Sequence, residues 1–154
     1  MKKSRLVLAA VTAGVMAMSA APALAASASQ QFNVKATVNA KCSIKTGPAE
    51  YDFGIYDPTV AADTDSGAGS AVIKCTKGTA ATITLSNPAM SNGTDNLTYS
   101  WFREVGRTTA FGNLVYNSTS NADHTVDFFG RIAALQDVGT GNYNNNTATF
   151  TVTY

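Results

Sequence analysis

Apolar and polar side chains alternate along two segments of the chain, one upstream of the first cysteine and one at the C-terminal end. Residues 32–40 read FNVKATVNA, and residues 147–154 read TATFTVTY. A period of two places apolar side chains on one face and polar side chains on the other, which is typical of a half-buried β-strand. The apolar face of the first predicted strand carries Phe32, Val34, Ala36, Val38 and Ala40. That of the second carries Ala148, Phe150, Val152 and Tyr154, so the chain ends within a predicted strand.

Six shorter runs between these segments also predict strands, because each is rich in β-branched, aromatic or alternating apolar residues. These runs are Tyr51–Tyr56, Ala71–Cys75, Ala81–Leu85, Leu97–Phe102, Leu114–Tyr116 and Val126–Ile132. Turn-forming Gly, Pro, Asn and Asp residues separate them. We predict a surface loop over Asp63–Ser70, where Gly and Ser are frequent. About eight short strands without a sustained helical period predict a single all-β domain, either a sandwich or a barrel.

Basic residues and a short apolar run open the chain. Lys2, Lys3 and Arg5 precede the apolar residues 6–21, and Ala23-Leu24-Ala25 follows as a small-x-small site. This order is typical of a secretory signal peptide that is cleaved after Ala25. A retained membrane anchor is the alternative, but the apolar run is shorter than the roughly 20 residues that a spanning helix needs. We therefore predict an exported protein whose signal peptide is residues 1–25.

Removal of this leader changes the charge balance. Three of the 11 basic residues lie in it, whereas all 10 acidic residues follow it, so the remaining chain carries more acidic than basic groups. This balance gives no electrostatic basis for binding nucleic acid or an anionic membrane. Residues 26–154 are enough to enclose one hydrophobic core, which agrees with a single domain.

The exported chain contains two cysteines, Cys42 and Cys75. Only one intrachain pairing is possible, and disulfides persist in oxidising compartments, so we predict a Cys42–Cys75 disulfide. A metal site is the weaker interpretation, because two thiols and one distant histidine do not complete a ligand set. We predict no metal and no cofactor.

Candidate catalytic groups are few. The single histidine, His124, follows Asp123, and a Ser–His–Asp triad would have to use it, yet no serine lies in a G-x-S-x-G motif. We interpret His124 as a turn or surface residue and predict no catalytic residues. Asp63 and Asp65 resemble the start of a calcium loop, but the later ligands of such a loop are absent from the sequence. We interpret this stretch as a solvated loop.

Two further alternatives stay open at this point. A carboxylate pair for glycoside hydrolysis is a three-dimensional arrangement that a sequence does not show. The acids that could form it are Asp52, Asp57, Asp127 and Asp137. Tyr99, Trp101 and Phe102 could form a carbohydrate-binding platform, although their alternating pattern favours core packing for some of them.

Several short motifs occur in an order and spacing that resemble those of the spore coat protein U domain family, which includes subunits of archaic chaperone–usher pili. The resemblance covers nearly all of residues 26–154. It rests on the alternating segment before Cys42 and on Asp52–Pro58, Val72–Gly78, Leu97–Tyr99, Arg107–Gly112, Phe129–Ile132 and Gly141–Tyr143. The chain departs from the family pattern at Phe111, where Trp is expected, and at Asn145, where Asp is common.

The resemblance implies an incomplete immunoglobulin-like β-sandwich that lacks its last strand and is completed by a donor strand from another subunit. Residues 26–40 would be an N-terminal donor-strand extension, and residues 41–154 the pilin domain. The donor side chains would be Phe32, Val34, Ala36 and Val38. The terminal strand with Phe150, Val152 and Tyr154 would line the groove that receives a donor.

The same resemblance implies a structural subunit of a surface pilus, with roles in adhesion and biofilm formation. Its partners would be identical or related pilus subunits, a periplasmic chaperone and an outer-membrane usher, and it would reach the cell surface through the periplasm. We predict no nucleic acid partner, no small-molecule substrate and no enzymatic activity. One alternative is a secreted spore-coat or surface-layer component that uses the same domain. Another is a carbohydrate-binding adhesin module, which needs an exposed aromatic or acidic pocket.

Overall fold

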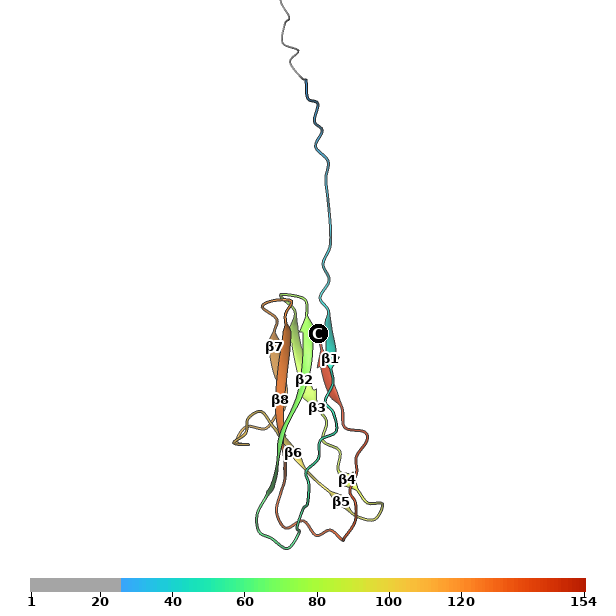
Figure 1. The fold of residues 1–154 in the computed structure, drawn as a ribbon, viewed down its shortest axis with the longest axis vertical. Helices are drawn as coiled ribbons and strands as arrows, with labels where there is room; N and C mark the ends of the chain where they lie inside the picture. The colour runs from blue at the N-terminus through green and yellow to red at the C-terminus, as the bar shows by residue number, and fades with distance from the viewer. Residues whose placement is uncertain (1–25) are drawn as a thin grey trace, which may run out of the picture. The chain divides into compact units, whose positions relative to one another are not determined.

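Nine β-strands and no helix make up residues 26–154, the part of the chain that the computed structural model describes (Figure 1). The strands are β1 (Cys42–Thr46), β2 (Thr64–Cys75), β3 (Ala80–Leu85), β4 (Met90–Ser91), β5 (Asn96–Leu97), β6 (Ser100–Phe102), β7 (Leu114–Asn117), β8 (Asp123–Ile132) and β9 (Phe150–Thr153). The described residues accordingly contain no helix that could cross a membrane. The predicted signal peptide, residues 1–25, lies outside the described part.

The larger sheet contains four antiparallel strands in the order β1-β2-β8-β6. β2 and β8 are its long central strands, and their side chains alternate between buried and exposed along the second half of β2 and most of β8. Ile73 and Phe128 are almost completely buried on the inner face. The alternating apolar pattern that predicted Ala71–Cys75 and Val126–Ile132 therefore reports this buried face.

A second sheet, in the order β7-β3-β9, lies against the inner face of the first, and β4 and β5 form a short two-stranded ribbon. The core between the sheets combines Ile73, Val126 and Phe128 from the larger sheet with Ala81 and Ile83 from β3. The chain is therefore an open all-β sandwich, which is one of the two architectures that the strand pattern predicted.

Residues 26–36 belong to a different unit of the chain from Thr37–Tyr154, which contains all nine strands. In this single chain residues 26–41 form no strand. The side chains of Phe32, Val34 and Val38 are 83%, 81% and 80% exposed. The alternating segment thus has the side-chain pattern of a half-buried strand, but it pairs with no strand in the described part of this chain.

Two details of the sequence-based assignment are wrong. Asp63–Ser70 was predicted as a loop, but Thr64–Ser70 forms the first half of β2 and pairs with β8. Within this half of the strand, Gly69 leaves room for the rings of Phe128 and Tyr51. Tyr51–Tyr56 was predicted as a strand, but it forms none, since no neighbouring strand offers it a ladder of backbone hydrogen bonds.

The predicted strand over Leu97–Phe102 is divided into β5 and β6. The break falls at Thr98, whose backbone N–H donates to the side chain of Gln136 over 2.8 Å. A side chain therefore replaces a neighbouring strand at this point.

Candidate binding groove

The two sheets end on strands β1 and β9, which lie beside each other at one side of the sandwich (Figure 1). β1 pairs only with β2, and β9 pairs only with β3, among the described residues. Each strand therefore presents a free edge of backbone N–H and C=O groups on the same side of the fold. Unpaired edges of this kind are templates for another strand.

A groove with a volume of about 940 Å³ opens beside these edges. Its two walls are residues 48–56, which follow β1, and residues 138–150, which lead into β9. Neither wall is a regular strand over most of its length. The floor between them is mainly apolar and consists of Leu85, Ser86, Met90, Leu97, Tyr99, Trp101, Phe128 and Ile132.

Aromatic rings form the centre of this floor. Trp101 makes edge-to-face contacts with Tyr99 and Phe128, at ring-centroid distances of 5.1 and 5.2 Å. Its indole N–H donates to the carbonyl of Ser86 over 2.9 Å, so the polar end of the ring is satisfied. The tryptophan is therefore fixed with one side in the core and the other toward the groove.

Tyrosine hydroxyl groups fix the first wall to the larger sheet and to the segment that follows β8. Tyr51 donates to the carbonyl of Gly67 over 2.5 Å and accepts from the backbone N–H of Gly130 over 2.6 Å. Tyr56 donates to the carbonyl of Ala133 over 3.1 Å and accepts from the N–H of Gln136 over 2.8 Å. These contacts replace the hydrogen-bond ladder that a strand would make.

The sheet leaves space for this wall because glycines lie beneath it. A Cβ atom added to Gly130 would lie 2.7 Å from the ring of Phe53 and 2.8 Å from that of Tyr51. A Cβ atom added to Gly69 would lie 2.3 Å from the ring of Phe128. Any larger residue at these two positions would collide with aromatic rings of the groove wall and floor.

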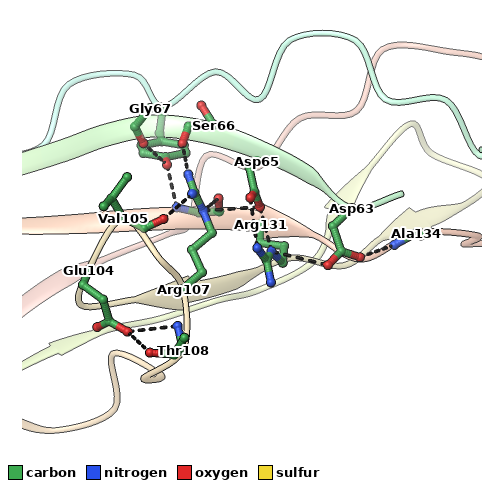
Figure 2. A network of polar contacts seen from close by, with 12 residues as sticks. Asp63, Asp65, Ser66, Gly67, Glu104, Val105, Arg107, Thr108, Arg131 and Ala134 are labelled. Atoms are coloured by element: carbon green, nitrogen blue, oxygen red, sulfur yellow. Dashed lines mark hydrogen bonds and ion pairs between the residues drawn. The ribbon is translucent and has the colours of Figure 1, made fainter. Parts of the chain in front are cut away.

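Tyr51 enters the sheet at an interruption in the pairing of β2 with β8. The register shifts between Asp65 and Ala68, so Gly130 has no direct partner on β2. Figure 2 shows how Arg107 fills the same gap: its guanidinium donates to the carbonyls of Gly130 over 3.0 Å, of Val105 over 2.7 Å and of Ser66. The interruption is thus closed by Tyr51 and Arg107 together.

Ion pairs surround this point (Figure 2). Arg131 donates two hydrogen bonds to the carboxylate of Asp65, over 2.6 and 2.9 Å, and lies 3.5 Å from that of Asp63. The hydrogen bond from Arg131 and, less strongly, the charge of Arg107 hold the pKa of Asp65 below its ordinary value. Asp65 therefore belongs to a paired strand, and Asp63, which immediately precedes that strand, is paired with Arg131. This corrects the interpretation of the two acids as part of a solvated loop.

The second wall is held by polar side chains of the β4–β5 region. Tyr143 donates to the carbonyl of Gly139 over 2.8 Å and accepts from the side-chain amide of Asn92 over 2.9 Å. The N–H of Gly139 donates to the carboxylate of Asp95 over 2.8 Å. Burial and the nearby Asp95 raise the pKa of the Tyr143 hydroxyl, which keeps it protonated as a donor.

Comparison with known proteins shows the family of this chain. Residues 28–153 match the family model of the Spore Coat Protein U domain. The chain belongs to the spore coat protein U family. It is 32% identical over 173 residues to Protein U of Myxococcus xanthus, and the match covers 96% of both chains. A chain in a solved structure of a chaperone–usher pilus is similar over 87% of this chain and 99% of its own length, with 17% identity and a TM-score of 0.47.

The predicted disulfide of this spore coat U-type domain is confirmed. Cys42 and Cys75 are bonded with an S–S distance of 2.04 Å, and they are opposite each other in the β1–β2 pair. The bond fastens the beginning of β1, and with it the root of the N-terminal extension, to the larger sheet.

The three residues predicted to line the groove, Phe150, Val152 and Tyr154, lie in three different environments. Phe150 lines the groove, Val152 packs against the core, and Tyr154 is 57% exposed. The predicted donor residues, Phe32, Val34, Ala36 and Val38, are exposed in this single chain.

The alternative catalytic and sugar-binding residues lie in several different parts of the fold. His124 lies in β8, not in a turn, and its ring stacks on Tyr116 with centroids 4.2 Å apart. Tyr99 and Trp101 belong to the groove floor, and Phe102 is half-buried with the guanidinium of Arg131 over its ring. Asp52, Asp57, Asp127 and Asp137 are all exposed. Residues 26–154 contain no cluster of three potential metal ligands.

Sequence reasoning did not find the residues that hold the groove walls. Tyr51 was read only as a strand residue, and the roles of Arg107, Tyr143 and Asn145 depend on partners far away in sequence. The usable signals were the Asp52–Pro58 and Gly141–Tyr143 motifs, each of which marked part of one wall without revealing how that wall is attached.

Proposed function

We propose that this chain is a structural subunit of a surface pilus, and that subunits join when residues 26–40 of one enter the groove of the next. The proposal rests on one observation above all: the domain has an open groove with a mainly apolar floor beside the free edge of β9, and the same chain carries an exposed alternating segment. The groove exposes apolar surface next to unpaired backbone groups, and the segment has the side-chain pattern of a strand that could cover them.

The side chains of the two parts are chemically matched. The groove floor is aromatic and aliphatic, and the extension presents Phe32, Val34, Ala36 and Val38 on one face. Complete burial of a Phe or Val side chain contributes about 1.5–3 kcal/mol each. Backbone hydrogen bonds along the free edge of β9 would add affinity, and the alternate side chains would add specificity. In this arrangement Phe150 would face the donor, with Val152 and Tyr154 continuing the edge.

The geometry of such a contact determines the form of the assembly. The donor segment and the acceptor groove are different surfaces of the same chain, so the contact is heterologous and generates an open filament when it does not close into a ring. We assign residues 1–25 to the signal peptide, 26–40 to the extension and 41–154 to the pilin domain. Activity is structural and not enzymatic.

The groove also explains which partners an assembling subunit would need. Before polymerisation its apolar floor would be exposed to water, which favours aggregation. A periplasmic chaperone would cover the groove, and an outer-membrane usher would exchange the chaperone for the next subunit. The assembled fibre would lie at the cell surface, where adhesion and biofilm formation are the expected roles.

A second candidate, a component of a spore coat or surface layer, is favoured by the name of the family to which the chain belongs. It could use the same strand exchange. A carbohydrate-binding module is less well supported, since the aromatic residues considered for it are committed to the groove floor and to an ion-pair network.

The test is polymerisation of the exported protein co-expressed with its candidate chaperone and usher, followed by electrophoresis in SDS with and without heating. We expect a ladder of multimers that collapses on boiling and that Val38→Asp abolishes. Thr37→Asp, which adds the same charge on the opposite face of the extension, is the matched control and should retain the ladder. A wild-type protein that is monomeric in both lanes, or a ladder that Val38→Asp leaves intact, would overturn the proposal.

A further inference from the structure

The pairing of β3 with β9 continues, after an interruption, into the second wall of the groove. The regular ladder ends where Leu85 is opposite Phe150. An isolated bridge farther along joins Ser91 to Asn144 through two backbone hydrogen bonds of 3.0 and 3.1 Å. Both pairs have the same register, because each step forward from Leu85 matches one step backward from Phe150. Residues 144–153 therefore form one long edge that is interrupted in the middle.

The interruption has a chemical cause. Pro88 lies within it, and a proline has no backbone N–H to donate to a neighbouring strand. The carbonyls of Pro88 and Ala89 are nevertheless satisfied. The side-chain amide of Asn145 donates to both of them, over 2.9 and 2.7 Å.

The other end of the same amide orders the chain that leads into β9. The Asn145 side-chain oxygen accepts from the backbone N–H groups of Thr147 and Ala148, over 2.7 and 3.0 Å. Asn145 is half-buried and lines the groove. One side chain thus joins both strands across the gap and uses both its donor and its acceptor groups.

We infer that Asn145 is a positioning residue for donor-strand binding, which holds residues 144–149 in line with β9 so that the donor meets one continuous edge. This inference rests on the proposed function. An aspartate at this position could accept from Thr147 and Ala148 but could not donate to the two carbonyls while it is ionised. The amide is therefore required by the Pro88-Ala89 segment of this particular chain.

The test compares Asn145→Asp with Asn113→Asp, which adds the same charge at an exposed residue outside the groove. The rate at which each full-length variant enters multimers is measured at pH 7.5 and at pH 4, relative to the wild type at the same pH. We expect Asn145→Asp to assemble about tenfold more slowly at pH 7.5, the loss typical of one buried hydrogen-bond partner. At pH 4 the rate should recover, because a carboxyl group that faces two carbonyls is largely protonated there and can donate. Asn113→Asp should match the wild type at both pH values.

Amide hydrogen exchange of the same monomers supplies a second measurement that does not depend on polymerisation. In Asn145→Asp at pH 7.5 the amides of Ser91 and Asn144 should exchange about tenfold faster, while those of Ile73 and Ile83 in the core should be unchanged. Equal assembly rates for the two variants, or equal exchange at Ser91 and Asn144, would overturn the inference. Absence of a ladder in the wild type would instead overturn the proposed function, and the exchange experiment would still decide the role of Asn145.

Discussion

The hydroxyl of Tyr51 lies 2.5 Å from the backbone carbonyl of Gly67, inside the gap between β2 and β8. A residue on the wall of the groove therefore completes the hydrogen bonding of the sheet behind it. The wall and the sheet are coupled through a single oxygen atom, which also accepts from the buried N–H of Gly130.

Removal of that oxygen should destabilise the domain without altering its packing. In Tyr51→Phe the ring remains, but the N–H of Gly130 is left buried without a partner, which should lower the free energy of unfolding by about 1–3 kcal/mol. Urea denaturation measures the change. Tyr116→Phe removes a hydroxyl from a ring that instead stacks on His124, and it should change stability by less than about 0.5 kcal/mol. Equal effects of the two substitutions would show that the hydroxyl of Tyr51 has no special role.

Arg107 should not be replaceable by lysine. Its guanidinium donates to three carbonyls and its side chain is only 7% exposed, whereas a lysine ammonium cannot reproduce the planar fork. We expect Arg107→Lys to lower the free energy of unfolding by about 2–4 kcal/mol. Arg131→Lys, at a more exposed ion pair, should lower it by less than about 1 kcal/mol. Chemical denaturation of both variants tests the contrast, which would be contradicted by similar losses.

Acid should weaken the domain partly through Asp65. Arg131 and Arg107 lower the pKa of this carboxyl group in the folded state below its ordinary value of 3.8. The unfolded chain therefore takes up the proton first, so the stabilisation is complete above about pH 4 and is lost as the pH falls through the folded-state pKa. The urea midpoint of the wild type should thus fall more steeply between pH 4 and about pH 2 than that of Asp65→Asn. Parallel curves would exclude this contribution, and added salt should reduce the difference, since the pair is partly exposed.

Loss of the disulfide should destabilise the groove side of the sandwich. The bond closes a loop with a sequence separation of 33, for which the chain-entropy model gives about 3–4 kcal/mol. Replacement of both Cys42 and Cys75 by Ala should lower the midpoint of unfolding, and reductant should lower that of the wild type to a similar value. Reductant should leave the double variant unchanged, which serves as the control. A wild type that is insensitive to reductant would contradict the prediction.

The sequence predicted those parts of the fold in which one face of a strand is buried by regular packing. Val126–Ile132 was predicted because alternate side chains enter the core, and β8 indeed contains it. The first half of β2 was missed because its glycines have no apolar side chains to reveal a buried face. At one of them, Gly69, the rings of Tyr51 and Phe128 occupy the space that a side chain would fill, which is a tertiary relationship.

The opposite error at Tyr51–Tyr56 has a related cause. Alternation reports that side chains face in two directions, but it does not report whether a neighbouring strand exists. Tyr51 and Phe53 do point into the sandwich, and the backbone between them has no ladder partner. The groove was expected from the family resemblance and not from periodicity, because alternation marks the strands that are present and does not show which strand edges stay unpaired.

Trp101 is the only tryptophan in the chain, and it lies in the floor of the groove. Its indole emission therefore comes from a single place, the surface that an incoming strand would cover. A strand that excludes water from this ring would shift the emission to shorter wavelengths, whereas changes elsewhere in the domain would contribute no tryptophan signal. The protein thus contains its own optical reporter of whether the groove is empty or filled, and the filling can be followed in real time without any added label.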